Sequence, residues 1–202
     1  LLATARAINS LALNQGAAGN VSVRCRNGLL ITPSALPYDR CAEEDLVWMD
    51  GTGRVEGRRK PSSEWRMHAD IYRHYPQSGA ILHAHSLYCT TLACLERPIP
   101  AFHYMVAVAG GDSIRCTPYA TFGTQQLSDT VIEALRDRTA ALLGHHGMIC
   151  YASDLDRVLA LAIEVETLAR IYLQALQVAE QPPVLAEEKM AEVLERFKDY
   201  KA

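Results

Sequence analysis

The chain has 202 residues, a formal net charge of −3 at pH 7 and an isoelectric point near 6.2. Such a chain offers no broad cationic surface, which excludes nucleic acid and anionic membranes as expected partners. The six cysteines form no Cys-x-x-Cys pair, and no apolar run approaches the roughly 20 residues of a membrane span. We therefore expect a soluble, cytoplasmic protein with free thiols and a single domain over residues 1–202.

The first third of the chain predicts a helix followed by two hairpins. Apolar positions recur at helical spacing over residues 1–15, before a glycine-rich break. Residues 21–34, "VSVRCRNGLLITPS", alternate on both sides of Asn27-Gly28, a dipeptide typical of a β-hairpin turn. A second hairpin is expected around residues 50–53.

From residue 62 onward, predicted strands alternate with predicted helices. A helix with a serine cap and an acid in its first turn is expected to end at Pro76. Strands are expected over residues 79–86 and 113–118, with a strand pair or a bulged strand over 139–151; helices are expected over 87–96, 124–138, 154–176 and 185–200. This alternation predicts a layered α/β domain, and the early hairpins mean that its sheet is not wholly parallel.

Two histidines, His83 and His85, stand one residue apart in "ILHAHS". Side chains at i and i+2 of a strand point the same way, so both imidazoles can reach one metal ion. Two histidines on a solvated strand face would give the same pattern. Because catalytic zinc commonly takes three protein ligands, a third candidate is needed. It lies in "LLGHHGM", where His145 or His146 could complete the set.

The start of the helix at "PSSEW" offers polar groups of two kinds. Glu64 is a candidate general base, although a carboxylate there also simply complements the helix dipole. Ser62 and Ser63, together with the free backbone N–H groups of a helix start, suit an anion such as phosphate.

Six motifs, in this order and at these separations, resemble the class II aldolase and adducin superfamily: "GNVSVR", "PSSEWRMH", "LHAHS", "PAFHYMVAVAGG", "PYATFGT" and "LLGHHGM". Within it they are most similar to the branch that cleaves L-fuculose 1-phosphate and related ketose 1-phosphates. The resemblance implies a three-layer α/β/α sandwich with a central, largely antiparallel sheet, and a homotetramer with active sites at subunit interfaces. It also implies zinc-dependent cleavage of a phosphorylated sugar to dihydroxyacetone phosphate and a small aldehyde such as lactaldehyde.

The resemblance assigns roles to particular positions of this chain. His83, His85 and His146 match the ligands of one Zn²⁺ per chain, and Glu64 matches the catalytic acid/base beside the metal. Tyr104 matches a tyrosine that donates a proton to the aldehyde oxygen. The matched substrate-binding positions are Asn20, Ser34, Ala35, Ser62 and Ser63 for the phosphate, and Phe122 and Tyr200 for the aldehyde.

One departure concerns the phosphate loop. The family usually has Thr-Gly or Ser-Gly where this chain has Ser34-Ala35. Glycine reaches positive φ freely, whereas alanine resists that conformation. A substrate somewhat different from fuculose 1-phosphate is therefore left open.

Three alternatives remain beside a fuculose-type aldolase. Aldolases for 5-deoxyribulose or 5-methylthioribulose 1-phosphate would share every group except the aldehyde pocket. A related metal-dependent sugar-phosphate epimerase or dehydratase is the second; the ribulose 5-phosphate 4-epimerases carry an aspartate after the two serines, which Glu64 argues against. An adducin-like binding module without a metal is disfavoured by the intact set of histidines.

Overall fold

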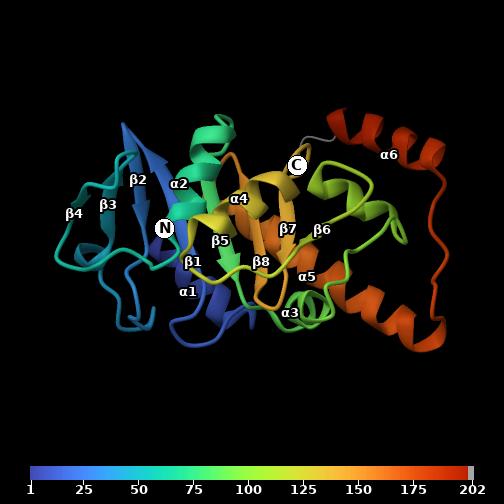
Figure 1. Cartoon of the computed structure of the whole chain (residues 1–202), viewed down its shortest axis with the longest axis horizontal. Coiled ribbons are helices and arrows are strands. Elements are labelled where there is room, and N and C mark those ends of the chain that lie inside the picture. The colour runs from blue at the N-terminus through green and yellow to red at the C-terminus, as the bar shows by residue number, and fades with distance from the viewer. Residues whose placement is uncertain (200–202) are drawn as a thin grey trace.

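The computed structural model describes residues 1–199, with side chains to residue 198 (Figure 1). Its strands are β1 (Asn20–Cys25), β2 (Gly28–Ile31), β3 (Val47–Asp50), β4 (Val55–Glu56), β5 (Ala80–Ala84), β6 (Arg115–Thr117), β7 (Ala140–Leu143) and β8 (Gly147–Ala152). Within the described residues they form one sheet in the order β4-β3-β2-β1-β5-β8-β7-β6. Only β6 and β7 of these pair parallel, which confirms the predicted, largely antiparallel sheet.

Helices cover both faces of this sheet. They are α1 (Leu2–Ser10), α2 (Trp65–His74), α3 (Leu87–Cys94), α4 (Gln125–Ala134), α5 (Leu155–Val178) and α6 (Glu187–Asp199), with 3₁₀ turns η1 (Glu43–Asp45) and η2 (Tyr104–Ala109). Helices α1, α3 and α5 lie on the side of the sheet opposite to α2 and α4 (Figure 1). The predicted three-layer α/β/α sandwich is therefore confirmed.

Alternation along the central strands separates two apolar cores. Leu82 of β5 and Cys150 of β8 point into the core under α3 and α5. Their neighbours Ile81 and Ile149 point into the core under α2 and α4. Because successive strand side chains face opposite sides, a strand buried on both faces reads as a nearly continuous apolar run. That is the reason why "AILHA" and "GMICYA" contain so few polar residues.

The first hairpin differs from its prediction by one position. Cys25 pairs with Gly28, so the two turn residues are Arg26 and Asn27 rather than Asn27 and Gly28. Arg26 takes the left-handed conformation, with φ +41°. Gly28 belongs to the strand, where a Cβ would clash with the carbonyl of Met49 on β3. Glycine is needed here because β3 packs closely against β2. Sequence alone does not distinguish a glycine required by strand packing from one required by a turn.

The predicted serine cap of the second helix is wrong. The N-cap residue of α2 is Glu64, with φ −101° and ψ 16°, and it makes no side-chain cap bond. The hydroxyl of Ser62 accepts a hydrogen bond from the backbone N–H of Glu64 at 3.3 Å, and its carbonyl accepts from that of Trp65 at 3.1 Å. Glu64 therefore precedes the helix, and its side chain is buried, 7% exposed.

The two histidines of "GHHG" lie in a turn. β7 and β8 pair antiparallel from Leu143 and Gly147 onward, which confirms a strand pair over residues 139–151. His145 has φ +54°, and the backbone N–H of His146 donates to the carbonyl of Leu143 at 2.9 Å. The tight turn directs the two histidine side chains to different surroundings, with His146 facing β5.

Helix α3 begins two residues after His85, and a carboxylate distant in sequence binds its N-terminus. Glu166 of α5 accepts hydrogen bonds from the hydroxyl of Ser86 at 2.6 Å and from the backbone N–H groups of Tyr88 and Cys89 at 2.9 Å each. An anion at a helix N-terminus satisfies free N–H groups and complements the helix dipole. Glu166 thus ties α3 to α5 next to the site.

Replacing Glu166 by alanine is expected to lower the free energy of unfolding by about 2–4 kcal/mol, because three hydrogen bonds to a charged acceptor are lost. Urea unfolding followed by circular dichroism measures this loss. Glu164→Ala, on the same helix, is the matched control and is expected to cost within about 0.5 kcal/mol. Equal losses in both variants would contradict the capping role.

Candidate metal and active site

Three histidines and one glutamate converge at one end of the central strands. His83 is the penultimate residue of β5, His85 follows that strand, His146 lies in the β7–β8 turn and Glu64 precedes α2. One ligand atom of each lies within 4.8 Å of the others. The central position of β5, between β1 and β8, brings these segments together.

The distances between these groups are short. Nε2 of His83 lies 3.0 Å from Nε2 of His85 and 3.1 Å from Oε2 of Glu64. Nε2 of His146 lies 3.3 Å from Oε1 of Glu64. The three imidazole rings stand nearly perpendicular to one another, with centroids 4.7–4.9 Å apart. The nitrogens therefore face a shared point, with Glu64 beside it.

This donor set fits a divalent metal such as zinc. Nδ1 of His83 donates to the carbonyl of Met148 at 2.8 Å, so Nε2 is the nitrogen that faces the cluster. Despite burial, Glu64 raises the pKa of His83, and a metal would bind Nε2 in place of its proton. Nitrogens about 2.0–2.1 Å from a tetrahedral zinc are roughly 3.3 Å apart, close to the separations found here. Oε1 of Glu64 is buried without a hydrogen-bond partner among the described residues, as expected beside a cation site.

Burial and mutual charge set the protonation of the cluster. Burial alone would raise the pKa of Glu64, but the charge and hydrogen bond of His83, the charge of His146 and the amide of Asn20 hold it below its usual range. Burial lowers the pKa of His146 to about 3 and that of His85 to about 4, with the charge of His83 adding to both. At pH 7 these two imidazoles are neutral and Glu64 is ionised, as ligands and a general base must be.

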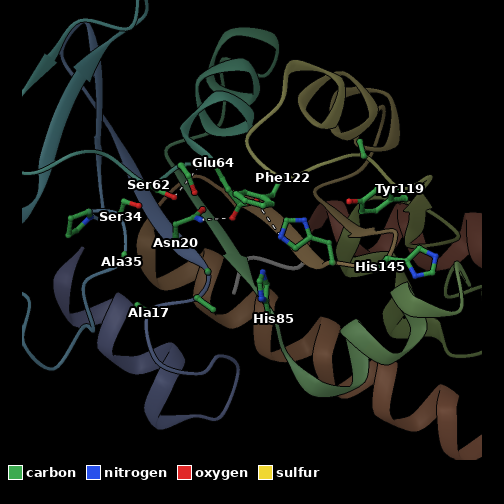
Figure 2. Close-up of a pocket in the computed structure, with 16 residues that line it drawn as sticks. Ala17, Asn20, Ser34, Ala35, Ser62, Glu64, His85, Tyr119, Phe122 and His145 are labelled. Carbon is green, nitrogen blue, oxygen red and sulfur yellow. Dashed lines mark hydrogen bonds and ion pairs between the residues drawn. The ribbon is translucent and has the colours of Figure 1, made fainter.

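A cavity of about 360 Å³ opens beside the four groups (Figure 2). Its lining contains most of the residues singled out from the sequence: Asn20, Ser34, Ala35, Ser62, Ser63, Glu64, His85, Phe122 and His146. Figure 2 shows Ser34, Ala35 and Ser62 together at one end of the cavity, and Tyr119 and His145 at the other. His83 lies behind the lining and is fully buried.

The small polar residues are contributed by two loops that run side by side. Pro33 and Pro61 form an isolated β-bridge. The backbone N–H of Ser34 donates to the carbonyl of Lys60 at 3.0 Å, and that of Ser62 donates to the carbonyl of Thr32 at 3.1 Å. The two loops thus present their hydroxyl groups to the same end of the cavity.

Ala35 adopts the conformation usually reserved for glycine, with φ +55°. Alanine resists the left-handed region at a cost of roughly 1–2 kcal/mol. The surrounding loop holds this conformation despite that cost, so the departure from the family's glycine leaves the backbone in a glycine-like state. The added methyl group is the remaining difference at the cavity wall.

Tyr104, one of the two predicted tyrosines, does not line this cavity. Tyr104 begins η2, is 51% exposed, and stacks on His103 with ring centroids 4.9 Å apart. It lines a separate hollow with Met105 and Phe197. Tyr200 lies outside the described residues. Phe122 does line the cavity and is 64% exposed at its rim.

Sequence reasoning named His145 only as an alternative metal ligand, and it missed Tyr119 and His68. Tyr119 and His145 line the cavity, with ring centroids 6.1 Å apart. Tyr119 lies three residues before Phe122 in "PYATFGT", which was a usable signal. His68 is fully buried on α2, and its Nε2 lies 2.5 Å from Oδ1 of Asn20. No local signal in the sequence marks His68, because its contact with Asn20 joins segments 48 residues apart.

The fold and the four donors define a metal-binding α/β/α protein whose site lies at the end of a mostly antiparallel sheet. The family description "Class II Aldolase and Adducin N-terminal domain" matches residues 1–173. The chain therefore belongs to the class II aldolase and adducin family, and within it to the metal-dependent aldehyde-lyases.

Similar proteins agree with this assignment. The "L-fuculose phosphate aldolase" of Escherichia coli O6:H1 is 50% identical over 99% of this chain and 93% of its own. The "5-methylthioribulose-1-phosphate/5-deoxyribulose-1-phosphate aldolase" of Rhodospirillum rubrum is 52% identical over 99% of this chain and 90% of its own. A solved structure of an "L-fuculose 1-phosphate aldolase" superposes with a TM-score of 0.94 at 41% identity, covering 98% of this chain and 94% of that one.

Replacing His85 by alanine removes a metal ligand. Mutating a residue that only hydrogen-bonds to a ligand typically lowers metal affinity by about 10- to 100-fold. We expect a larger loss of affinity in His85→Ala. Titration of metal-free protein with Zn²⁺, followed by calorimetry, measures the affinity. His145→Ala changes the neighbouring histidine of the turn and is expected to bind like the wild type. Wild-type affinity in His85→Ala would place the metal elsewhere.

Proposed function

We propose that the protein is a zinc-dependent aldolase that reversibly cleaves a ketose 1-phosphate of the L-fuculose type to dihydroxyacetone phosphate and a small aldehyde such as lactaldehyde. The observation that carries the proposal is the convergence of His83, His85, His146 and Glu64 at a cavity whose other end is lined by serines. The relatives named for L-fuculose phosphate support the substrate class.

His83, His85 and His146 would hold the zinc through their Nε2 atoms. When bound, the ion supplies a Lewis acid that polarises the ketose carbonyl and stabilises negative charge on the substrate oxygens. Glu64, ionised at neutral pH, accepts and returns the proton at the carbon next to the carbonyl. Glu64 reaches the cavity with only a small part of its surface exposed.

The two ends of the cavity suit the two ends of such a substrate. The serine hydroxyls of the paired loops and the amide of Asn20 bind the phosphate, since these groups donate hydrogen bonds to an anion. Phe122 lines the aldehyde side. Tyr200, which lies outside the described residues, is proposed to contact the aldehyde as well. This division puts the bond to be cleaved between the loops and the rim, next to Glu64.

Tyr104 donates the proton to the aldehyde oxygen in the direction of synthesis and accepts it in cleavage. Because Tyr104 is exposed and lies away from the cavity of its own chain, a second copy supplies it. This requires a homo-oligomer with sites at subunit interfaces, and a homotetramer is the assembly we propose. The free cysteines support a cytoplasmic location.

A second substrate class is favoured by one observation. The relative from Rhodospirillum rubrum, named for 5-methylthioribulose and 5-deoxyribulose 1-phosphates, is as similar to this chain as the one named for L-fuculose phosphate. These substrates would use the same metal, base and phosphate groups. They differ in the aldehyde, which would contact the rim formed by Phe122 and Tyr119.

A substrate screen distinguishes the two classes. Cleavage of fuculose, rhamnulose, 5-deoxyribulose and 5-methylthioribulose 1-phosphates is followed by coupling the release of dihydroxyacetone phosphate to its reduction. The highest kcat/KM is expected for fuculose 1-phosphate. A clear preference for 5-methylthioribulose or 5-deoxyribulose 1-phosphate would replace the first class by the second, and no cleavage of any would overturn both.

Glu64→Gln is expected to keep the metal but to lose about 10²- to 10⁴-fold in proton transfer, because the side chain keeps its shape and loses its basicity. Exchange of solvent deuterium into dihydroxyacetone phosphate, followed by NMR, isolates this half-reaction.

Glu96→Gln is the matched control for Glu64→Gln. Its carboxylate lies 3.5 Å from Nε2 of His145, outside the metal cluster. We expect wild-type exchange in this variant. Wild-type exchange in Glu64→Gln itself would remove Glu64 from the mechanism.

Ala35→Gly is expected to bind phosphate equally or more tightly, because glycine occupies φ +55° without strain and removes a methyl group from the cavity wall. Competition by inorganic phosphate and by phosphoglycolate is measured in both proteins. Stability is expected to change by less than about 1 kcal/mol, since relief of strain is offset by a more flexible unfolded chain.

The same measurements test whether the substrate carries a phosphate at all. Cleavage of a sugar 1-phosphate is compared with that of the free sugar. If neither anion competes and both sugars react equally well, the phosphate assignment fails and the substrate class with it.

A further inference from the structure

A chain of buried hydrogen bonds runs from Glu64 away from the cavity. Nδ2 of Asn20 donates to Oε2 of Glu64 at 3.0 Å. Oδ1 of the same amide lies 2.5 Å from Nε2 of His68 on α2. Asn20 is 2% exposed and His68 is 0% exposed, so water does not replace either contact. The carboxylate of Glu64, proposed as the base, is thus held by Asn20 through a buried hydrogen bond.

The chain continues through two hydroxyl groups. Nδ1 of His68 lies 2.7 Å from Oγ of Ser22, and this oxygen lies 2.9 Å from the hydroxyl of Tyr72. Ser22 is fully buried on β1, and Tyr72 lies one turn after His68 on α2. At the far end, the guanidinium of Arg24 lies 4.7 Å from the centre of the Tyr72 ring and donates to the Tyr72 carbonyl. The chain therefore spans the layer between β1 and α2.

The direction of every bond follows from the atoms that face one another. Nδ2 of Asn20 faces Oε2 of Glu64 and donates to it, so the carbonyl of the same amide faces His68 and accepts. Nε2 of His68 must then carry a proton. Full burial keeps this imidazole neutral, since it lowers the pKa of His68 to about 3, and Nδ1 is consequently an acceptor.

The last two bonds take the same direction. Because Nδ1 of His68 accepts, the hydroxyl of Ser22 donates to it. Oγ of Ser22 then accepts from the hydroxyl of Tyr72, and burial, which raises the pKa of Tyr72, keeps that donor protonated. Every donor in the series points toward Glu64.

We propose that His68, held as the Nε2–H tautomer by Ser22, is a positioning residue that fixes the amide of Asn20 with its N–H groups toward Glu64 and the cavity. The inference rests on the proposed function in one respect, that Glu64 transfers the proton. With the amide reversed, its carbonyl oxygen would face the carboxylate and would repel both Glu64 and a substrate phosphate. The second N–H of the amide remains a donor for that phosphate.

The tautomer of His68 is measured directly. Long-range ¹H–¹⁵N correlation spectra of the uniformly labelled protein separate protonated from unprotonated imidazole nitrogens, and loss of signals in His68→Gln assigns them. The expected result is a neutral ring with its proton on Nε2. A proton on Nδ1 would overturn the proposal, whatever reaction the protein catalyses.

Substitutions test the consequence for catalysis. His68→Leu leaves Asn20 without its donor and is expected to lower kcat and solvent-deuterium exchange by about 10- to 100-fold with its metal content unchanged. His68→Gln retains an N–H₂ that can donate to Asn20 and is expected to stay within about tenfold of the wild type. Inorganic phosphate is expected to compete less well in His68→Leu than in His68→Gln.

Asp70→Asn is the control for general loosening of α2. Asp70 is buried on the same helix and accepts from Ser128 and Gln125 of α4, without contact to Asn20. It is expected to lose stability and keep kcat.

If His68→Leu keeps kcat, or if His68→Gln and His68→Leu lose it equally, His68 has no positioning role. If the wild type cleaves no ketose phosphate, the proposed function fails, while the tautomer still decides the arrangement around Asn20.

Discussion

The site depends on one electrostatic constraint: a carboxylate and three imidazoles, two of these groups buried and two half-buried, have ligand atoms within 4.8 Å of one another. Taking such groups out of water is costly unless opposite charge lies among them. Contacts of Glu64 with His83 and His146 on one side, and with the amide of Asn20 on the other, offset this cost of desolvation. Strand β5, the β7–β8 turn and the start of α2 together hold these four side chains in place.

The fold meets this constraint by bringing distant segments to the middle strand. β5 pairs with β1 on one side and with β8 on the other, so Asn20 lies directly opposite His83. Gly19 has φ +65°, and a Cβ there would clash with the carbonyl of His83, so only glycine permits this approach of β1. The ends of the central strands and the start of α2 position the four donors, and the paired loops beside them carry the serines of the cavity.

Periodicity and turn signals predicted the helices and strands well, because strands buried on both faces and amphipathic helices leave strong patterns. The three histidines and Glu64 could be found through "HAH", "GHHG" and "PSSEW", where spacing or a helix start gives a physical reason. The position of Glu64 outside the helix and the partner of Asn20 could not be predicted, since both depend on contacts between segments far apart in sequence. Alanine at the position of the expected glycine suggested a changed loop, yet tertiary contacts hold Ala35 in the left-handed conformation.

The lengths of the outermost strands have a consequence for how copies of the chain meet. β4 has two residues and β6 has three, and Glu56 of β4 forms an ion pair with Arg54, the residue just before that strand. Short, charged edge strands present few free backbone groups, so a second sheet gains little by pairing with them. Edge-to-edge aggregation is thereby disfavoured. Copies of the chain are left to associate through side-chain surfaces, and the polar end of the sheet stays clear of intermolecular strand pairing.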